Sequence, residues 1–324
     1  MNTRFLATFC AIAETGSLAA AARRLRITSA AAGEQMQTLE KILGSRLVAR
    51  QGRRVVPTEA GHAVLPAARA ILAKIEDLRQ LAQAGQLRGL LRVGAISTAL
   101  VTVVPPALQS MAQEHPEIEL KVIPGTSAQL YQQLEEGEID CAITVQPRFR
   151  LPKRMGWHPI RSEPLVLVTP ADLAGSDART LLMAAPFIRI DRTAWSGHII
   201  TSFLRDQRLE PEELFEMDAQ EAIIILIASG LGVSLLPDWG IVAPAGRSIR
   251  KLPIGDPRYD RKLGLIGLAG AREALIRVFA AALSAAAQAG PSWVESELTT
   301  SGRRCGDTGR RADGPANDAK SGTQ

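Results

Sequence analysis

Apolar positions in the first 43 residues recur at helical spacing in three short segments. The residues of each set lie three or four positions apart, which places them on one face of an amphipathic helix. Three helices of this length can share one small core, and the run Ala19 to Ala22 keeps the second helix thin enough for close packing. The three predicted stripes are Leu6, Phe9 and Ala13; Leu18, Ala22 and Leu25; and Met36, Leu39 and Leu43.

Only a short turn, "RIT", separates the second predicted helix from the third. Thr28, the last residue of this turn, can cap the third helix with its side-chain oxygen. Two short helices joined in this way predict helix-turn-helix geometry. In that geometry the second member lies in the major groove of DNA and contacts bases from its N-terminal turns.

A single long helix is predicted from Thr58 to Gly85, with Thr58 as N-cap, Glu59 at the positive dipole end and Gly85 as stop. Pro66 falls in its first two turns and is expected to bend the helix without breaking it. Its apolar stripe alternates spacings of four and three, as in a coiled-coil seam. The stripe predicts either a dimer seam or packing against its own domain, and we favour the seam because no earlier element is long enough to cover the stripe. The stripe consists of Val64, Ala68, Ile71, Ile75, Leu78 and Ala82.

From Leu90 onward the pattern changes to apolar strands that alternate with helices. Near-continuous apolar strands linked by helices predict parallel sheets covered on both faces, and the length suits two of them. The strands are "LLRVGAI", "IELKVIPG", "IDCAITV", "EPLVLVTP", "PFIRID", "LFEMD", "VSLLP" and "KLGLIGLA"; the helices are "PPALQSMAQEH", "SAQLYQQLEEGE", "HIITSFLRDQ", "AQEAIIILIASG" and a last one, Ala271 to Ala289. Residues 290–324 are polar and aperiodic, which predicts a disordered tail.

The charge of the chain is concentrated at its start. Residues 1–90 hold 13 Lys/Arg against 6 Asp/Glu, whereas residues 91–324 hold 25 against 27, and the whole chain of 324 residues has a net charge of +5. An excess of this kind is expected where a protein neutralises phosphates, although a solvated basic surface gives the same numbers.

Other features of the composition restrict the class of protein. No run of 18 apolar residues exists, and charged or polar residues such as Arg4 and Glu14 interrupt the N-terminus where a secretory signal needs an apolar core. We therefore expect a cytoplasmic protein that does not enter a membrane. Cys10, Cys141 and Cys305 form no CxxC pair and no even set, so buried free thiols are expected rather than disulfides.

If the third helix buries its apolar stripe, its opposite face is polar. On that face Gln37 can pair with adenine, Glu34 can accept from the cytosine amino group, and Ala30 can contact a thymine methyl group. An ordinary exposed helix is also polar, and Gly33 indicates either a close approach to DNA or simple tolerance of a helical glycine. The candidate DNA contacts from this helix and the turn before it are Arg26, Thr28, Ser29, Ala30, Gly33, Glu34, Gln37 and Lys41.

The segment "RQGRRVV" that follows predicts a short hairpin with Gly52 in its turn. Arginines on such a wing suit phosphate contacts, which fix the register on a duplex without reading its sequence. The candidate phosphate contacts are Arg46, Arg50, Arg53 and Arg54.

The run from Phe5 to Gly61 resembles the winged helix-turn-helix of LysR-type transcriptional regulators. The resemblance covers roughly residues 4–289 and includes "DCAI", "EPLVLVTP" and "GLGVSLLP" in the same order. It implies an α/β protein with an N-terminal all-α winged helix-turn-helix domain and a C-terminal periplasmic-binding-protein-like domain of two α/β subdomains. The implied division is a DNA-binding domain at 1–58, a linker and dimerisation helix at 59–88, and an effector-binding domain at 89–289. Its subdomain I covers about 89–161 and 267–289, and its subdomain II covers about 162–266.

The recognition helix departs from the pattern of the family. Members usually begin it with Ser-Gln-Pro, whereas this chain has Thr28, Ser29 and Ala30. Gly33 stands in place of a serine, and Glu34 stands where a basic residue is common. We expect an altered operator preference or weaker DNA binding than is usual in the family.

A cleft between two such subdomains favours ligand sites at the carboxyl ends of strands and at helix N-termini. The hydroxyl residues there also cap helices routinely, so both interpretations stay open. Arg189 can hold a ligand carboxylate bidentately or pair with Asp191, and a small organic anion is the hypothesis for the effector. The candidate effector-binding residues are Ser97, Thr98, Thr126, Ser127, Arg189, Asp191, Gly230, Gly232 and Ser234.

The alternatives to a regulator are an enzyme and a transport-type binding protein. The sequence has no GxSxG, HExxH or GxxxxGK[ST] motif, and its four histidines share no pattern of carboxylates or cysteines. The basic N-terminal segment disfavours a transport protein. The sequence therefore predicts a non-enzymatic regulator without cofactor or metal, whose partners are double-stranded operator DNA, a small-molecule effector and further copies of itself in a homodimer or homotetramer.

Overall fold

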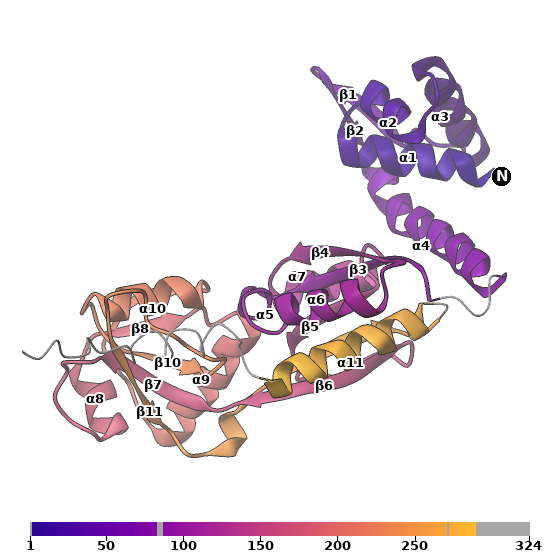
Figure 1. Cartoon of the computed structure of the whole chain (residues 1–324). Helices are drawn as coiled ribbons and strands as arrows, with labels where there is room; N and C mark the ends of the chain where they lie inside the picture. The colour runs from indigo at the N-terminus through magenta and orange to yellow at the C-terminus, as the bar shows by residue number, and fades with distance from the viewer. Residues whose placement is uncertain (1, 83–86, 271, 290–324) are drawn as a thin grey trace, which may run out of the picture. The chain divides into compact units, whose positions relative to one another are not determined.

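The computed structural model describes residues 2–82, 87–270 and 272–289. Its N-terminal head consists of three helices and a two-stranded hairpin (Figure 1). Side chains cap all three helices: Asn2 accepts from the amide of Arg4, Ser17 from that of Ala20, and Thr28 from that of Ala31, which confirms the predicted cap. The elements are α1 (Thr3–Thr15), α2 (Leu18–Leu25), α3 (Ser29–Leu43), β1 (Val48–Gln51) and β2 (Arg54–Pro57).

The core of the head follows most of the predicted stripes, but Ala13 is half-buried and outside the core cluster, and the end of α3 departs from the prediction. Met36 and Leu39 are buried, but Leu43 is 40% exposed, so its expected inward position was wrong. The amides of Leu47 and Val48 donate to the Glu40 carboxylate, at 2.8 and 3.2 Å, and turn the chain back toward the domain. Leu47, which is fully buried, thereby joins the head core, and Leu43 does not.

The long helix α4 (Glu59–Ala82) runs through Pro66 without interruption. Thr58 caps it as predicted, because its Oγ1 accepts from the Gly61 amide at 3.0 Å. Ala68 is 1% exposed and packs in the head core with Val64, so the first part of the stripe is covered by α1 and not left for a partner. Ile71 and Leu78 remain 40% and 65% exposed. The expected stop at Gly85 lies outside the described residues.

The first sheet of the following domain has five strands in the order β4-β3-β5-β12-β6. Strand β3 pairs in parallel with β4 and β5, whereas β12 is antiparallel to both β5 and β6. Subdomain I was expected to resume at about residue 267. The chain returns to the first sheet earlier than that, because β12 begins at Arg261. The strands are β3 (Gly89–Ala95), β4 (Ile118–Pro124), β5 (Cys141–Val145), β6 (Met155–Glu163) and β12 (Arg261–Leu268), with helices α5 (Ser97–Leu100), α6 (Val104–Glu114), α7 (Ser127–Glu135) and α11 (Glu273–Ala289).

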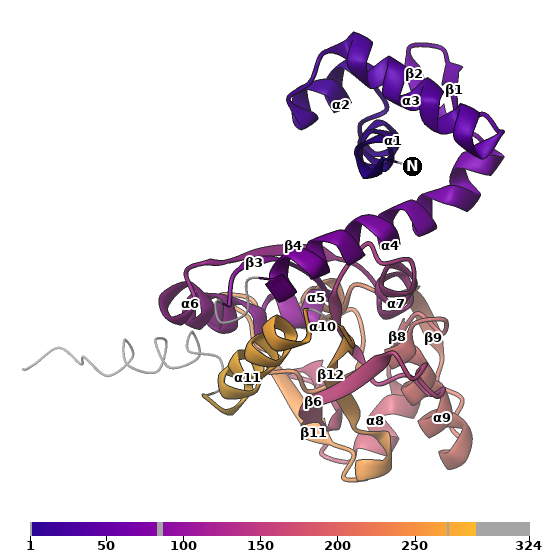
Figure 2. The ribbon, with the colours of Figure 1, turned by 90° about the vertical axis from the view of Figure 1, so that its right-hand side faces the viewer.

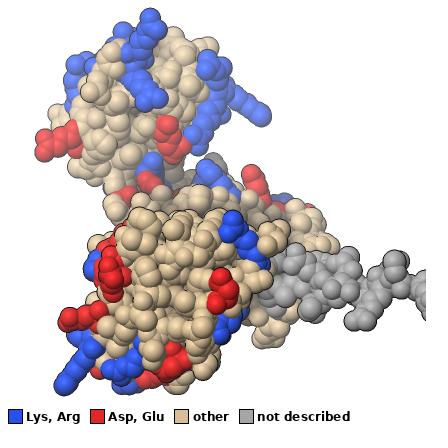
Figure 3. Space-filling model, turned by 90° about the vertical axis from the view of Figure 1, so that its left-hand side faces the viewer, with Lys and Arg blue, Asp and Glu red and all other residues tan. Residues whose placement is uncertain are grey.

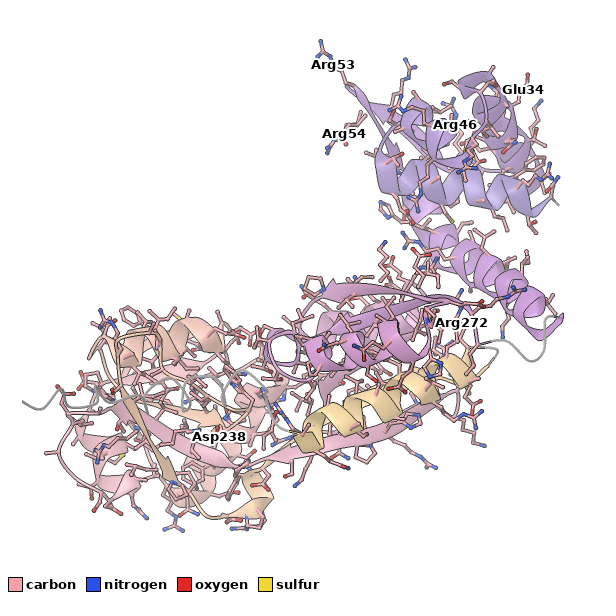
Figure 4. The ribbon with its side chains drawn as sticks, in the orientation of Figure 1. Glu34, Arg46, Arg53, Arg54, Asp238 and Arg272 are labelled. Atoms are coloured by element: carbon pink, nitrogen blue, oxygen red, sulfur yellow. The ribbon has the colours of Figure 1, made fainter. Side chains whose placement is uncertain are left out.

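Helix α11 closes this subdomain although it is the last described element of the chain. It packs against α6 and β6, and both views show it beside β6 (Figures 1 and 2). The buried Arg272, directly before the helix, forms an ion pair with Asp140 (Arg272 is labelled in Figure 4). The other oxygen of that carboxylate accepts from the Arg92 amide at 2.7 Å, which fixes the start of α11 to the first sheet.

The second sheet is built around β7, which is antiparallel to β10 on one side and to β11 on the other. Strands β8 and β9 are parallel to each other and join this sheet through a parallel bridge between Phe187 and Val233. The elements are β7 (Leu165–Pro170), α8 (Ala178–Ala184), β8 (Phe187–Ile190), α9 (Trp195–Gln207), β9 (Glu213–Met217), α10 (Gln220–Ala228), β10 (Ser234–Pro237), β11 (Ile249–Pro253) and the short helix η1 (Pro257–Tyr259).

Both sheets are therefore mixed, and the expectation of parallel sheets was wrong. A continuous apolar run reports that both faces of a strand are covered, and it contains no information about strand direction. The strands β7 and β12 each follow a crossing of the chain from one sheet to the other, and the two crossings run in opposite directions, since β12 is antiparallel to β6 and β11 is antiparallel to β7.

Gly61 gives a test of the junction between the hairpin and α4. A Cβ at this position would lie 2.1 Å from the Leu47 carbonyl oxygen and 3.1 Å from Pro57 Cβ. We expect Gly61→Ala to destabilise the head by about 1–3 kcal/mol, the usual cost of overpacking. Gly33→Ala is the control, because its Cβ would meet only Leu18 Cδ2 at 3.6 Å and alanine favours a helix by about 1 kcal/mol. Chemical denaturation of both variants measures the difference, and equal stabilities would contradict the packing.

Candidate functional site

The polar face of α3 is free of the head core. Of the twelve candidate DNA contacts, eleven are exposed and only Gly33 is half-buried, beside α2. Glu34 lies on this face and extends from α3 (Figure 4). The turn before α3 begins at Arg26, which adopts the left-handed conformation with φ 55 and ends α2. The predicted helix-turn-helix is therefore present, with its second helix available on the outside.

Strands β1 and β2 form the predicted wing. Gln51 pairs with Arg54, which leaves Gly52, at φ 62, and Arg53 as the two turn residues. Arg53 and Arg54 extend from the tip of the hairpin and away from the helices (Figure 4). The head shows several Lys and Arg side chains on the face seen in Figure 3.

A cleft of about 520 Å³ lies at the carboxyl ends of β3, β4, β8 and β9. Five of the nine predicted effector-binding residues line it: Ser97, Thr98, Thr126, Ser127 and Asp191. Their hydroxyl groups have structural roles too. Thr126 and Gln129 form a capping box at α7, and Ser127 Oγ accepts from the Val145 amide at 3.3 Å. Of these five residues Thr126 caps a helix, whereas α5 begins without a side-chain cap. All five lie in the cleft wall, and their contact with a ligand stays a prediction.

Arg189 does not line the cleft, and it does not pair with Asp191. It is buried, and its guanidinium donates to Glu213 at 2.7 Å and to Thr201 at 2.9 Å. Both partners lie outside the cleft lining, Thr201 on α9 and Glu213 at the start of β9, and they hold the Arg189 side chain away from the cleft. Asp191 instead accepts from the amide and the hydroxyl of Thr193, which lowers the pKa of its carboxyl below the ordinary value.

Gly230, Gly232 and Ser234 also lie outside the cleft lining. Strand β10 runs parallel to β8 at the Phe187–Val233 bridge, so its start lies at the amino end of β8, whereas the cleft is at the carboxyl end. A Cβ at Gly232 would lie 2.3 Å from the Pro186 carbonyl oxygen, which explains a glycine there by close packing. Ser234 is fully buried.

The base of the cleft contains a charged residue that the sequence analysis missed. Arg261 is completely buried and forms an ion pair with Glu163, and its Nη2 donates to Thr98 Oγ1 at 3.1 Å. Arg161 contacts the other oxygen of Glu163 at 2.7 Å. A buried ion pair offsets its desolvation only when its remaining donors are satisfied, and Arg261 meets this condition with Thr98 and, at 3.4 Å, Ser196.

Subdomain II contributes further lining that the sequence analysis did not select. Trp195 and Ser196 begin α9, and Asp218 and Glu221 flank the start of α10. Two signals in the sequence pointed to Asp218 and Glu221: the polar residue directly after "LFEM", and the helix start "AQE". Among the described residues, no group of three or more His, Cys, Asp or Glu side chains has an arrangement suited to a metal ion. No described helix is long and apolar enough to cross a membrane.

A winged helix-turn-helix with an exposed basic face, followed by a two-subdomain α/β fold with a cleft, defines a ligand-responsive DNA-binding protein. The chain belongs to the LysR family of bacterial transcriptional regulators. Residues 3–62 match the model described as "Bacterial regulatory helix-turn-helix protein, lysR family", and residues 84–288 match that of the "LysR substrate binding domain".

Individual proteins support this assignment. The chain is 30% identical to the transcriptional activator IlvY of Salmonella typhimurium over 74% of this chain and 83% of the relative. It is 32% identical to the transcriptional regulator IlvR of Caulobacter vibrioides over 80% and 87%. Among solved structures, a full-length variant of OxyR from Pseudomonas aeruginosa has the same fold, with a TM-score of 0.72 at 23% identity over 90% and 98% of the two chains.

The wing arginines give a test of phosphate contact. We expect Arg53→Ala and Arg54→Ala each to reduce the salt dependence of DNA binding by about 0.9 in the slope of log K against log salt, because each removes one neutralised phosphate. Fluorescence anisotropy with a labelled duplex at several salt concentrations measures this slope. Arg205→Ala, which removes a 74% exposed arginine from α9, is the control. A wing variant with the slope of the control would show that its arginine does not contact the backbone.

The two described cysteines give a second test. Burial raises the pKa of Cys10 to about 11 and raises the pKa of Cys141 well above its ordinary value. Both thiols therefore stay protonated at pH 8, and the thiolate is the reactive form. We expect iodoacetamide to label both cysteines only after unfolding, as measured by peptide mass mapping. Rapid labelling of either one in the native protein would contradict this.

Proposed function

We propose that this regulator binds a double-stranded operator through α3 and the wing, and that a small molecule in the cleft changes this binding. The observation that carries the proposal is the combination, in one chain, of an exposed polar face on α3, exposed arginines on the wing and a cleft lined by polar groups. On α3, Gln37 and Glu34 would contact base edges, while Arg46, Arg50, Arg53 and Arg54 would contact phosphates.

Glu34 makes the reading face of this chain unusual. Its carboxylate is exposed on α3, where a duplex would bring phosphates close. A carboxylate in the major groove accepts from cytosine but repels the backbone. We therefore propose that the operator of this protein differs from the family pattern at the base facing Glu34.

The effector would act by linkage. A ligand that prefers one arrangement of the two subdomains stabilises that arrangement by no more than its difference in affinity for the two states. Arg261 supports this role because it bonds Thr98 of the first subdomain and Ser196 of the second at the base of the cleft. A ligand that contacts these groups would change the balance between the subdomains, and therefore the DNA affinity.

We further propose that the chain acts as a homo-oligomer in the cytoplasm and does not catalyse a reaction. The exposed apolar side chains of α4, Ile71 and Leu78, support the oligomer, because large apolar groups left exposed along one helix indicate a partner surface. Dimeric binding places two recognition helices in successive major grooves about one helical turn apart.

The test is a gel mobility-shift assay with the DNA just upstream of the gene of this protein. We expect a shifted complex at low salt, and we expect Leu78→Glu to yield smaller particles in analytical ultracentrifugation and to weaken the complex about tenfold or more. Met183→Glu, which places the same charge at a 44% exposed apolar position on α8, is the control. Failure of the wild-type protein to bind any duplex would overturn the proposed function. Wild-type assembly of Leu78→Glu would overturn the role of α4 alone.

A further inference from the structure

One wall of the cleft carries three carboxylates. Strands β8 and β9 pair in parallel with Ile190 opposite Met217, so the next residues, Asp191 and Asp218, lie side by side at the carboxyl edge of the sheet. Glu221 joins them from the first turn of α10. All three line the cleft. The topology therefore collects negative charge on the side contributed by subdomain II.

Little positive charge balances this wall. Among the described residues that line the cleft, the cationic side chain is that of Arg261, which is already paired with Glu163. The N-termini of α9 and α10 each add roughly half a positive charge, which is less than the three carboxylates carry. Burial, and then Asp191 and Glu221, raise the pKa of Asp218 above its ordinary value, as expected where like charges are crowded.

The carboxylate of Glu221 is incompletely satisfied. Its Oε2 accepts from Ser97 across the cleft at 3.5 Å, while its Oε1 is buried and has no hydrogen-bond partner among the described residues. A buried carboxylate oxygen without a donor is costly, and a ligand that supplies a charged N–H donor would remove this cost.

The wall of carboxylates favours a cationic group, whereas the opposite wall of the cleft favours an anionic group. The N-terminus of α7 faces the cleft through Thr126, Ser127 and Ala128. The capping box satisfies the amides of Thr126 and Gln129, which leaves the first-turn amides of Ser127 and Ala128 as donors toward the cleft. Such a helix N-terminus favours an anionic group.

An aromatic surface connects the two walls. Trp195 lines the cleft, and its ring is held in place by Phe149, at 5.7 Å between centroids, and by Tyr131, at 6.2 Å. An indole face beside carboxylates attracts ammonium groups and packs against apolar carbon. Ile96 and Val145 add apolar lining.

We propose that the effector is an amino-acid-like zwitterion. Its ammonium group contacts Asp218 and Glu221, its carboxylate accepts from the α7 N-terminus, and its apolar part lies against Trp195. This inference rests on the proposed function only in using the cleft as the effector site. It keeps the anionic group expected from the sequence and adds a cation. A metal ion on the same wall is disfavoured, because the described carboxylates do not converge on one point.

The test uses the full chain and three matched probe sets: the standard L-amino acids, the corresponding 2-hydroxy acids, which lack the ammonium group, and the corresponding amines, which lack the carboxylate. Thermal shift identifies the probes that bind, and calorimetry gives Kd. We expect at least one amino acid to bind and its 2-hydroxy acid to bind about tenfold more weakly or not at all. We expect Asp218→Asn and Glu221→Gln to lose a similar factor, while Glu210→Gln, at an exposed position after α9, retains the wild-type Kd.

The outcomes separate this inference from the proposed function. Binding confined to 2-hydroxy acids, or the absence of binding by any amino acid at about 10 mM, would overturn the zwitterion and leave operator binding untouched. Equal Kd values for Asp218→Asn, Glu221→Gln and Glu210→Gln would overturn the role of the carboxylate wall. An amino acid that binds the cleft without changing operator affinity would support the zwitterion and contradict the effector role instead.

Discussion

The buried ion pair between Glu163 and Arg261 determines how the two subdomains are joined. Glu163 ends β6, Arg261 begins β12, and the two residues are direct partners in the antiparallel ladder. Arg161 contacts the same carboxylate and also donates to the Trp239 carbonyl oxygen at 2.9 Å. Removal of one member of such a cluster leaves an uncompensated buried charge, at a cost of about 3–5 kcal/mol. The same three charged residues, Glu163, Arg261 and Arg161, therefore stabilise both the strands at the crossings between the subdomains and the base of the cleft.

Most of the helices and strands were predictable from the sequence, because apolar periodicity reports burial directly. The three head helices and the alternation after Leu90 depend on this signal, whereas the wing was predicted from Gly52 in its turn and the cap from the side-chain oxygen of Thr28. Strand direction was not predictable, since β7 and β12 have the same continuous apolar pattern as the parallel β3. Leu43 was misplaced for a related reason. The apolar periodicity continues to the end of α3, but the head core does not extend as far as Leu43, which is exposed.

The cleft was predictable in position and only partly in chemistry. Hydroxyl residues at the carboxyl ends of β3 and β4 were found because that edge of a sheet is a general ligand site. Arg189 was selected by its charge, yet its guanidinium is bonded to Glu213 and Thr201, outside the cleft lining. Asp218 and Glu221 were missed because their meeting with Asp191 depends on the parallel pairing of β8 and β9, which joins segments separated by α9.

Thr58 has two hydrogen bonds whose consequence extends beyond the cap of α4. Its Oγ1 accepts from the Gly61 amide and donates to the Arg46 carbonyl oxygen at 2.6 Å, so the first turn of α4 is bonded to the segment that leads into the wing. Ala68 and Leu72 extend this connection into the head core. The physical boundary of the head thus falls after Leu72, and a hybrid regulator that exchanges heads between relatives would have to be spliced within α4 beyond that residue.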